Sequence, residues 1–81
     1  MSKTLEEKML INSYRIAVTA GDLNLPLDPV ELGRTLGLHH NKSKTVIKQM
    51  VRGNFFRKLN EEQVSLTAHG IKLAQALLSE P

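Results

Sequence analysis

The sequence predicts a mainly α-helical domain with a small β-hairpin, in the order helix, helix, helix, strand, strand, helix. Three observations support this order: helix start and stop signals in the first half, an amphipathic basic segment in the middle, and two short β-prone runs after it. The chain has 81 residues, which is enough for a single domain over residues 1–81 and too few for two.

The first helix has a recognisable start and stop. Thr4 and Glu7 have the spacing of a capping box, in which a hydroxyl and a carboxylate satisfy free N–H groups of the first turn. The helix is predicted to reach Ala20, because Gly21 follows it and glycine commonly ends a helix. Residues 22–27 are then expected to form a loop.

The second helix has the clearest start in the chain. Asp28 is a favoured capping residue, and Pro29 stands at the first helical position, where proline is favoured too. This helix is predicted to end at Leu36. Gly33 and Gly37 fit two helices joined by a tight turn, because the helices need a small residue where they meet and the turn needs a residue that tolerates positive φ.

A third helix is predicted to begin at His40 or Asn41 and to end near Arg52, before Gly53. On a helical wheel, four apolar residues and Ser43 fall on one face, which is therefore expected to face the core. The opposite face and its flanks carry amide, hydroxyl and cationic groups and no acid. These residues are Asn41, Lys42, Lys44, Thr45, Lys48, Gln49 and Arg52.

The positive charge of the chain is concentrated around this helix. The net charge is only +3, but residues 39–58 hold six Lys and Arg and no acid. A localised basic stripe is typical of a site for a polyanion. The alternative interpretation is a solvated basic face without a ligand.

Two short strands and a last helix complete the predicted order. Residues 55–59 and 63–66 are β-prone, and the polar segment 60–62 between them is turn-like. Thr67 can cap a final helix over about 68–79.

Residues 32–78 resemble bacterial and archaeal winged helix-turn-helix transcriptional regulators of the broad group that includes the MarR, PadR and ArsR families. The segments that carry the resemblance are 31–38, 50–55 and 64–70, the last with a Leu-Thr-x-x-Gly pattern. The resemblance implies a sequence-specific protein that binds double-stranded DNA, acts as a transcriptional regulator and inserts helix 41–52 into the major groove. The DNA-binding residues expected on this basis and on charge are Asn41, Lys42, Lys44, Thr45, Lys48, Gln49, Arg52, Arg57 and Lys58.

The predicted hairpin turn departs from that pattern. It contains Glu61 and Glu62, whereas many DNA-binding hairpins of this type carry Arg or Lys, and carboxylates are repelled by phosphate. Contacts from the hairpin to the DNA phosphate backbone are therefore assigned to Arg57 and Lys58. The acidic turn also keeps a second hypothesis open, a winged-helix protein–protein interaction module without DNA binding. A third possibility is an RNA-binding or non-specific chromosome-coating module.

Several classes of protein lack support in the sequence. There is no cysteine, and we find no phosphate-binding glycine loop and no catalytic pattern of nucleophile and base, so no enzyme activity and no catalytic residue are predicted. His39, His40 and His69 lack the acidic neighbours of a metal site, and neither metal nor other cofactor is expected. No signal peptide and no membrane partner are expected, and a cytoplasmic location fits the absence of cysteine.

The first helix carries more apolar residues than one small core needs, which predicts a homodimer. The last helix shows a milder excess. The expected interface consists of Leu10, Ile11, Tyr14, Val18 and Leu73. The alternative is that the leucine-containing loop 22–27 folds over the additional surface.

Overall fold

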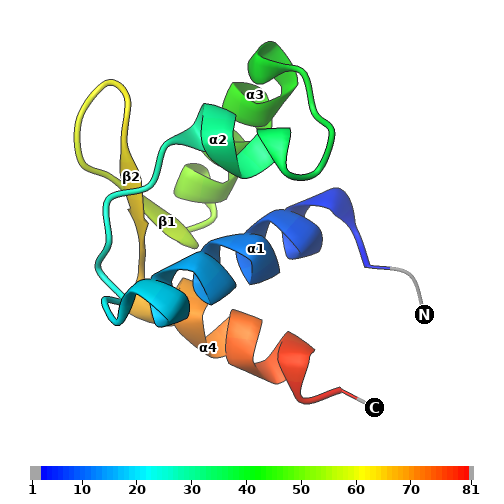
Figure 1. The fold of residues 1–81 in the computed structure, drawn as a ribbon, viewed down its shortest axis with the longest axis vertical. Coiled ribbons are helices and arrows are strands. Elements are labelled where there is room, and N and C mark those ends of the chain that lie inside the picture. Colours follow the sequence, from blue (N-terminus) through cyan, green and yellow to red (C-terminus); the bar gives the residue numbers. More distant parts are fainter. Residues whose placement is uncertain (1–2, 81) are drawn as a thin grey trace.

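We describe residues 3–80 in a computed structural model of the chain, and the order of elements matches the prediction (Figure 1). Within these residues, no helix is long and apolar enough to cross a membrane. The elements are α1 (Leu5–Ala20), α2 (Pro29–Arg34), α3 (His40–Arg52), β1 (Phe56–Lys58), β2 (Val64–Leu66) and α4 (Ala68–Leu78).

Helices α1 and α4 pack against each other at one end of the molecule (Figure 1). The predicted capping box begins α1: the backbone N–H of Glu7 donates to the Thr4 hydroxyl, and the backbone N–H of Thr4 donates to the Glu7 carboxylate. Gly21 ends the helix with a φ of 74°, as predicted. The Gln75 side-chain amide donates to the Tyr14 hydroxyl at 3.2 Å and links the two helices.

Helices α2 and α3 meet where the sequence predicts a close approach. A Cβ atom on Gly33 would lie 2.5 Å from the Cβ of Ser43, and it would overlap the Ser43 hydroxyl. Ser43 is fully buried, and its hydroxyl donates to the His39 carbonyl one turn earlier. Glycine on one helix and serine on the other therefore set the distance between the two backbones.

The turn after α2 confirms the expected role of Gly37, whose φ is 74°. The α-helix itself ends at Arg34, two residues before the predicted end at Leu36. The chain tightens there, because the N–H of Leu36 donates to the carbonyl of Gly33, three residues earlier. Asn12 of α1 reaches across to this end of α2, and its amide donates to the Leu32 carbonyl at 3.0 Å.

The hairpin is tied to the segment before α2. Strands β1 and β2 are antiparallel, with Phe56 opposite Leu66. On the other side of β2, Leu27 and Val64 exchange two backbone hydrogen bonds of 2.7 and 2.9 Å. Figure 1 shows this cyan segment running alongside β2. Residues 22–27 are therefore not only a loop, as predicted, but also fix the hairpin against the start of α2.

The Leu-Thr-x-x-Gly pattern joins the hairpin to α4. Thr67 caps the helix by accepting from the backbone N–H of Gly70, and its own hydroxyl donates to the Asn54 carbonyl. A Cβ on Gly70 would overlap the carbonyl oxygen of Phe55. Asn54 has a φ of 65°, so the left-handed residue after α3 is this asparagine and not Gly53.

The core corrects part of the predicted dimer interface. Leu10 and Ile11 are only 1% and 7% exposed within the single chain, so they are not available to a partner. Three helices, α2, α3 and α4, contact α1. In the loop between α1 and α2, Leu27 is buried and Leu25 packs against the core, whereas Leu23 is 38% exposed.

Candidate functional site

Helix α3 is anchored by one face and leaves the other free. Its core face is buried through Ser43, Val46, Ile47 and Met50. All nine side chains that the sequence assigned to DNA binding are exposed, seven on α3 and two on β1. These nine are Asn41, Lys42, Lys44, Thr45, Lys48, Gln49, Arg52, Arg57 and Lys58.

The start of α3 is held by histidine. The backbone N–H of Asn41 donates to Nδ1 of His39 at 3.2 Å, so an imidazole performs the capping role that Ser, Thr, Asp or Asn usually perform. The rings of His39 and His40 lie 4.2 Å apart. One turn later, the Thr45 hydroxyl donates to the Asn41 carbonyl at 2.9 Å. The polar groups at this end of the helix are thus ordered by local hydrogen bonds.

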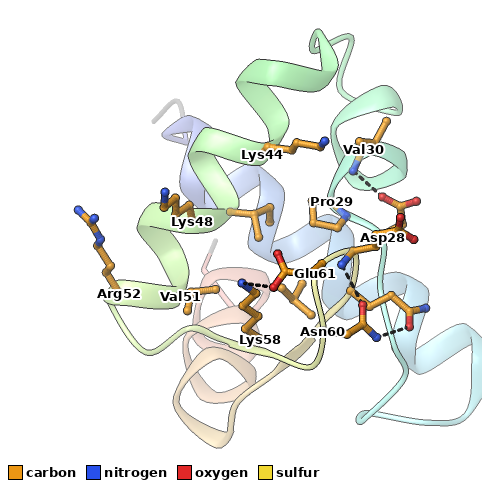
Figure 2. Close-up of a pocket in the computed structure, with 14 residues that line it drawn as sticks. Asp28, Pro29, Val30, Lys44, Lys48, Val51, Arg52, Lys58, Asn60 and Glu61 are labelled. Atoms are coloured by element: carbon orange, nitrogen blue, oxygen red, sulfur yellow. Dashed lines mark hydrogen bonds and ion pairs between the residues drawn. The ribbon is translucent and has the colours of Figure 1, made fainter.

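A groove of about 660 Å³ lies between α3, the start of α2 and the hairpin (Figure 2). Its lining residues come from all three elements, with polar groups on the walls and apolar side chains between them. They are Asp28, Pro29, Val30, Lys44, Ile47, Lys48, Val51, Arg52, Lys58, Asn60, Glu61, Glu62, Gln63 and Val64.

The α3 wall of this groove is cationic. Lys44, Lys48 and Arg52 are spaced four residues apart, so they form one row along the helix with a rise of about 6 Å per step. Figure 2 shows the three side chains leaving α3 in sequence along its length. Among residues 3–80, the ion pairs include none of these three cations. Their charges are therefore available to an anion.

The hairpin wall is mixed in charge and is locally ordered. Lys58 and Glu61 form an ion pair with 3.4 Å between nitrogen and oxygen (Figure 2). Asn60 holds the turn, because its amide donates to the side chain of Gln63 and its oxygen accepts from the backbone N–H of Glu62. The two carboxylates of the turn thus face the same groove as the cationic row of α3.

The structure divides the predicted residues into two groups. Lys44, Lys48, Arg52 and Lys58 line the groove. The other five predicted side chains are exposed outside it: Asn41, Lys42, Thr45, Gln49 and Arg57.

The sequence did not indicate that the start of α2 belongs to the same site. Asp28, Pro29 and Val30 line the groove because the Leu27–Val64 bridge draws this segment against the hairpin. A bridge of one residue pair leaves no periodic pattern in a sequence, so the only available signal was the leucine immediately before the capping aspartate.

Comparisons with protein-family models, curated proteins and solved structures give no match. The geometry of the chain itself is therefore the basis for a functional conclusion.

Proposed function

We propose that this chain is a winged helix-turn-helix domain that binds double-stranded DNA in a sequence-specific manner and regulates transcription. In this proposal α3 enters the major groove, and α2 with the Gly37 turn positions it. The hairpin takes the place of the wing. A regulator of this kind would act in the cytoplasm, where bacterial and archaeal DNA lies. The proposal includes neither a catalytic step nor a cofactor.

The observation that carries this proposal is the exposed face of α3. Every side chain on it that the sequence singled out is accessible, and the helix contains no acid. Amide and hydroxyl groups hydrogen-bond base edges, and Lys and Arg neutralise phosphates. The opposite face is fixed in the core, so these groups are presented on a rigid element.

The two groups of residues support a division of work. The row Lys44, Lys48 and Arg52 lines the groove next to the hairpin, so we assign these cations to the phosphates of one DNA strand. Asn41, Thr45 and Gln49 are exposed outside the groove and are assigned to base edges.

The test is a set of fluorescence anisotropy titrations with random duplex DNA, single-stranded DNA and RNA. Three to five phosphate contacts per chain would give a log–log salt slope of about −3 to −5. Duplex should bind more tightly than single strand or RNA. Absence of duplex binding at about 50 mM salt, where electrostatic binding is stronger than at physiological salt, would contradict the proposal.

The acidic turn favours one alternative function, a docking module for a basic protein. Glu61 has a side chain that is 92% exposed, and it stands where a DNA-binding wing often has a cation. Under this alternative, the titrations would show no duplex binding at any salt concentration. A basic protein partner would then be lost when Glu61 and Glu62 are neutralised.

A homodimer is part of the proposal, with a smaller interface than the sequence predicted. Val18 is 51% exposed, whereas Tyr14 and Leu73 are half-buried. Two-fold dimers are common, and a dimer would present two copies of α3 to half-sites one DNA turn apart, about 34 Å. Light scattering at micromolar concentration should give twice 9.1 kDa. A mass of one chain, or a dimer unchanged by Val18→Glu, would contradict this interface.

A further inference from the structure

Three polar residues of α3, which we call the outer row, lie beside the cationic row of the groove. Asn41, Thr45 and Gln49 are spaced four residues apart, and all three are exposed outside the groove. The two rows differ in their chemistry, because the groove row is cationic and the outer row has two amides, one hydroxyl and no charge. An uncharged row gains less from phosphates than a cationic one, so the outer row is suited to base edges.

The hydroxyl of Thr45 is already engaged within the helix. It donates to the Asn41 carbonyl at 2.9 Å, one turn earlier. Guanine presents only acceptors in the major groove, N7 and O6, so it finds no donor at Thr45. Threonine carries its hydroxyl and its methyl group on the same carbon, and with the hydroxyl turned to the backbone the methyl group is left for a ligand. Thymine is the base whose major-groove edge carries a methyl group.

The two amides of the outer row are presented from a fixed backbone. The N–H of Asn41 donates to Nδ1 of His39 at 3.2 Å, and its carbonyl accepts from Thr45. The side-chain amides of Asn41 and Gln49 enter none of the hydrogen bonds formed among residues 3–80. An Asn or Gln amide matches adenine, because it can donate to N7 and accept from the N6 amino group at the same time.

The outer row has no side chain suited to guanine. Arg and Lys are the usual partners of guanine O6 and N7. Three of the four Arg and Lys residues of α3 line the groove next to the hairpin. The fourth, Lys42, is in line with Val46 and Met50, which are buried, so it stands at the edge of the exposed face.

We propose that the outer row reads A·T pairs, with Thr45 contacting the methyl group of a thymine and Asn41 and Gln49 each bonding an adenine. This proposal rests on the function proposed above and adds the identity of the bases. Steps of four residues rise about 6 Å along a helix, whereas base pairs are about 3.4 Å apart. Where the row follows the groove, the three contacts therefore fall about two base pairs apart.

The first experiment selects binding sites for the full chain from random duplex DNA. A·T pairs should be enriched at positions about two base pairs apart. In the Asn41→Ala and Gln49→Ala variants, a different one of these positions should lose its preference, by about fivefold or more. Enrichment of G·C pairs at the positions that depend on these two residues would overturn the proposal, and so would duplex binding without any enriched site.

The second experiment replaces each thymine of the selected site in turn by uracil, which keeps the base pair and removes only the methyl group. One replacement should weaken binding of the unmodified protein about fourfold, as expected for the loss of one buried methyl group. The Thr45→Ser variant keeps the hydroxyl and lacks the methyl group, so it should bind the thymine and uracil duplexes equally. Thr19→Ser removes an exposed methyl group on α1 and should keep the fourfold difference.

Two results distinguish this proposal from the function on which it rests. Absence of any duplex binding would refute both. Sequence-specific duplex binding in which no uracil replacement has an effect, or in which Thr45→Ser keeps that effect, would overturn the thymine contact and leave the DNA-binding function intact. Thr45→Val, which keeps a methyl group without the hydroxyl, should retain the effect of uracil. All these variants should melt close to the unmodified protein, because the side chains are exposed.

Discussion

Helix α3 and the turn of the hairpin form opposite walls of one groove, but they are positioned by different interactions. Helix α3 is held by a buried face that includes Val46, Ile47 and Met50. The hairpin has strands of three residues each, and its turn is held by short-range hydrogen bonds of Asn60. The exposed charges contribute little to either position. We infer that the helix is cationic and the turn acidic because the two walls bind different groups, and not because the fold requires these charges.

The prediction with the largest expected effect tests whether the two walls differ in their contribution to the free energy of unfolding. Met50→Ala should lower the free energy of unfolding by about 2–5 kcal/mol, because it opens a cavity under α3. Leu59→Ala at the end of the hairpin should cost less than about 1 kcal/mol, since Leu59 is 40% exposed. Thermal or urea unfolding checks both values. Similar losses in the two variants would show that the turn end of the hairpin contributes as much to stability as the buried face of α3.

The next effect tests how α2 positions α3. Gly33→Ala should destabilise the fold by about 1–3 kcal/mol, because the added methyl group meets Ser43 and the helices must separate. The same substitution in a Ser43→Gly background should cost clearly less, since the space is then available. Equal costs in the two backgrounds, measured by urea unfolding, would show that the Gly33–Ser43 approach does not set the helix spacing.

Binding measurements compare the two sides of α3. Lys48→Ala should reduce the salt slope of duplex binding by about one, and Gln49→Ala should relax sequence preference at about 1–3 kcal/mol. Neither should change the melting temperature much, because both side chains are exposed. Lys72→Ala, on α4, is the control for loss of one positive charge. Duplex binding equal to that of the unmodified protein in both α3 variants would show that the reading face is misassigned.

A smaller effect is expected for the hairpin turn. Replacement of Glu61 and Glu62 by Gln should tighten duplex binding by up to about 1 kcal/mol, since exposed charges contribute little individually. The narrow minor groove of A-tracts has an enhanced negative potential, so the unmodified protein should disfavour A-tract flanks and the double variant should tolerate them. Glu6→Gln removes a carboxylate on α1 and should show neither change. Flank preference that is identical in all three proteins would place the turn away from DNA.

The smallest effect concerns α1, which belongs to neither wall. The backbone hydrogen bond from Thr4 holds the pKa of Glu7 below its usual value. Because the folded pKa is the lower one, this contribution to stability is present above the unfolded pKa and is lost as the pH falls through the folded pKa. Unfolding measured from neutral to acid pH should show a smaller loss of stability on acidification for Glu7→Gln, with unchanged duplex affinity at neutral pH. An identical pH dependence would mean that the capping box contributes nothing to acid stability.

The sequence predictions are most accurate where the interacting residues lie close together in the sequence. The caps at Thr4, Asp28 and Thr67 depend on residues two or three positions away, and all three are confirmed. The close approach at Gly33 was also predictable. Glycine destabilises the interior of a short helix, so its presence there is expected where two backbones must come close together.

Predictions that required the whole fold were less accurate. The helical wheel of α1 shows more apolar residues than a single core-facing stripe requires, and the sequence therefore assigns Leu10 and Ile11 to a dimer interface. Both residues are in fact buried within the single chain. The helix in fact contacts three others. The groove was missed for a similar reason, since it depends on the contact between Leu27 and Val64. On α3 the exposed face was predicted correctly, but the division between groove-lining and outer residues was not.

The bridge between Leu27 and Val64 has a consequence for the behaviour of the protein in concentrated solution. An open strand edge is a template for strands of other molecules, and it is a common route to aggregation. At Val64 the buried strand β2 has partners on both sides, so this part of its backbone cannot recruit a foreign strand. On the other side of the sheet, β1 pairs with no second strand among residues 3–80, and its Arg57 and Lys58 are exposed. The positive charges of Arg57 and Lys58 repel the same charges on a second copy of the protein, which disfavours pairing of two β1 strands between molecules.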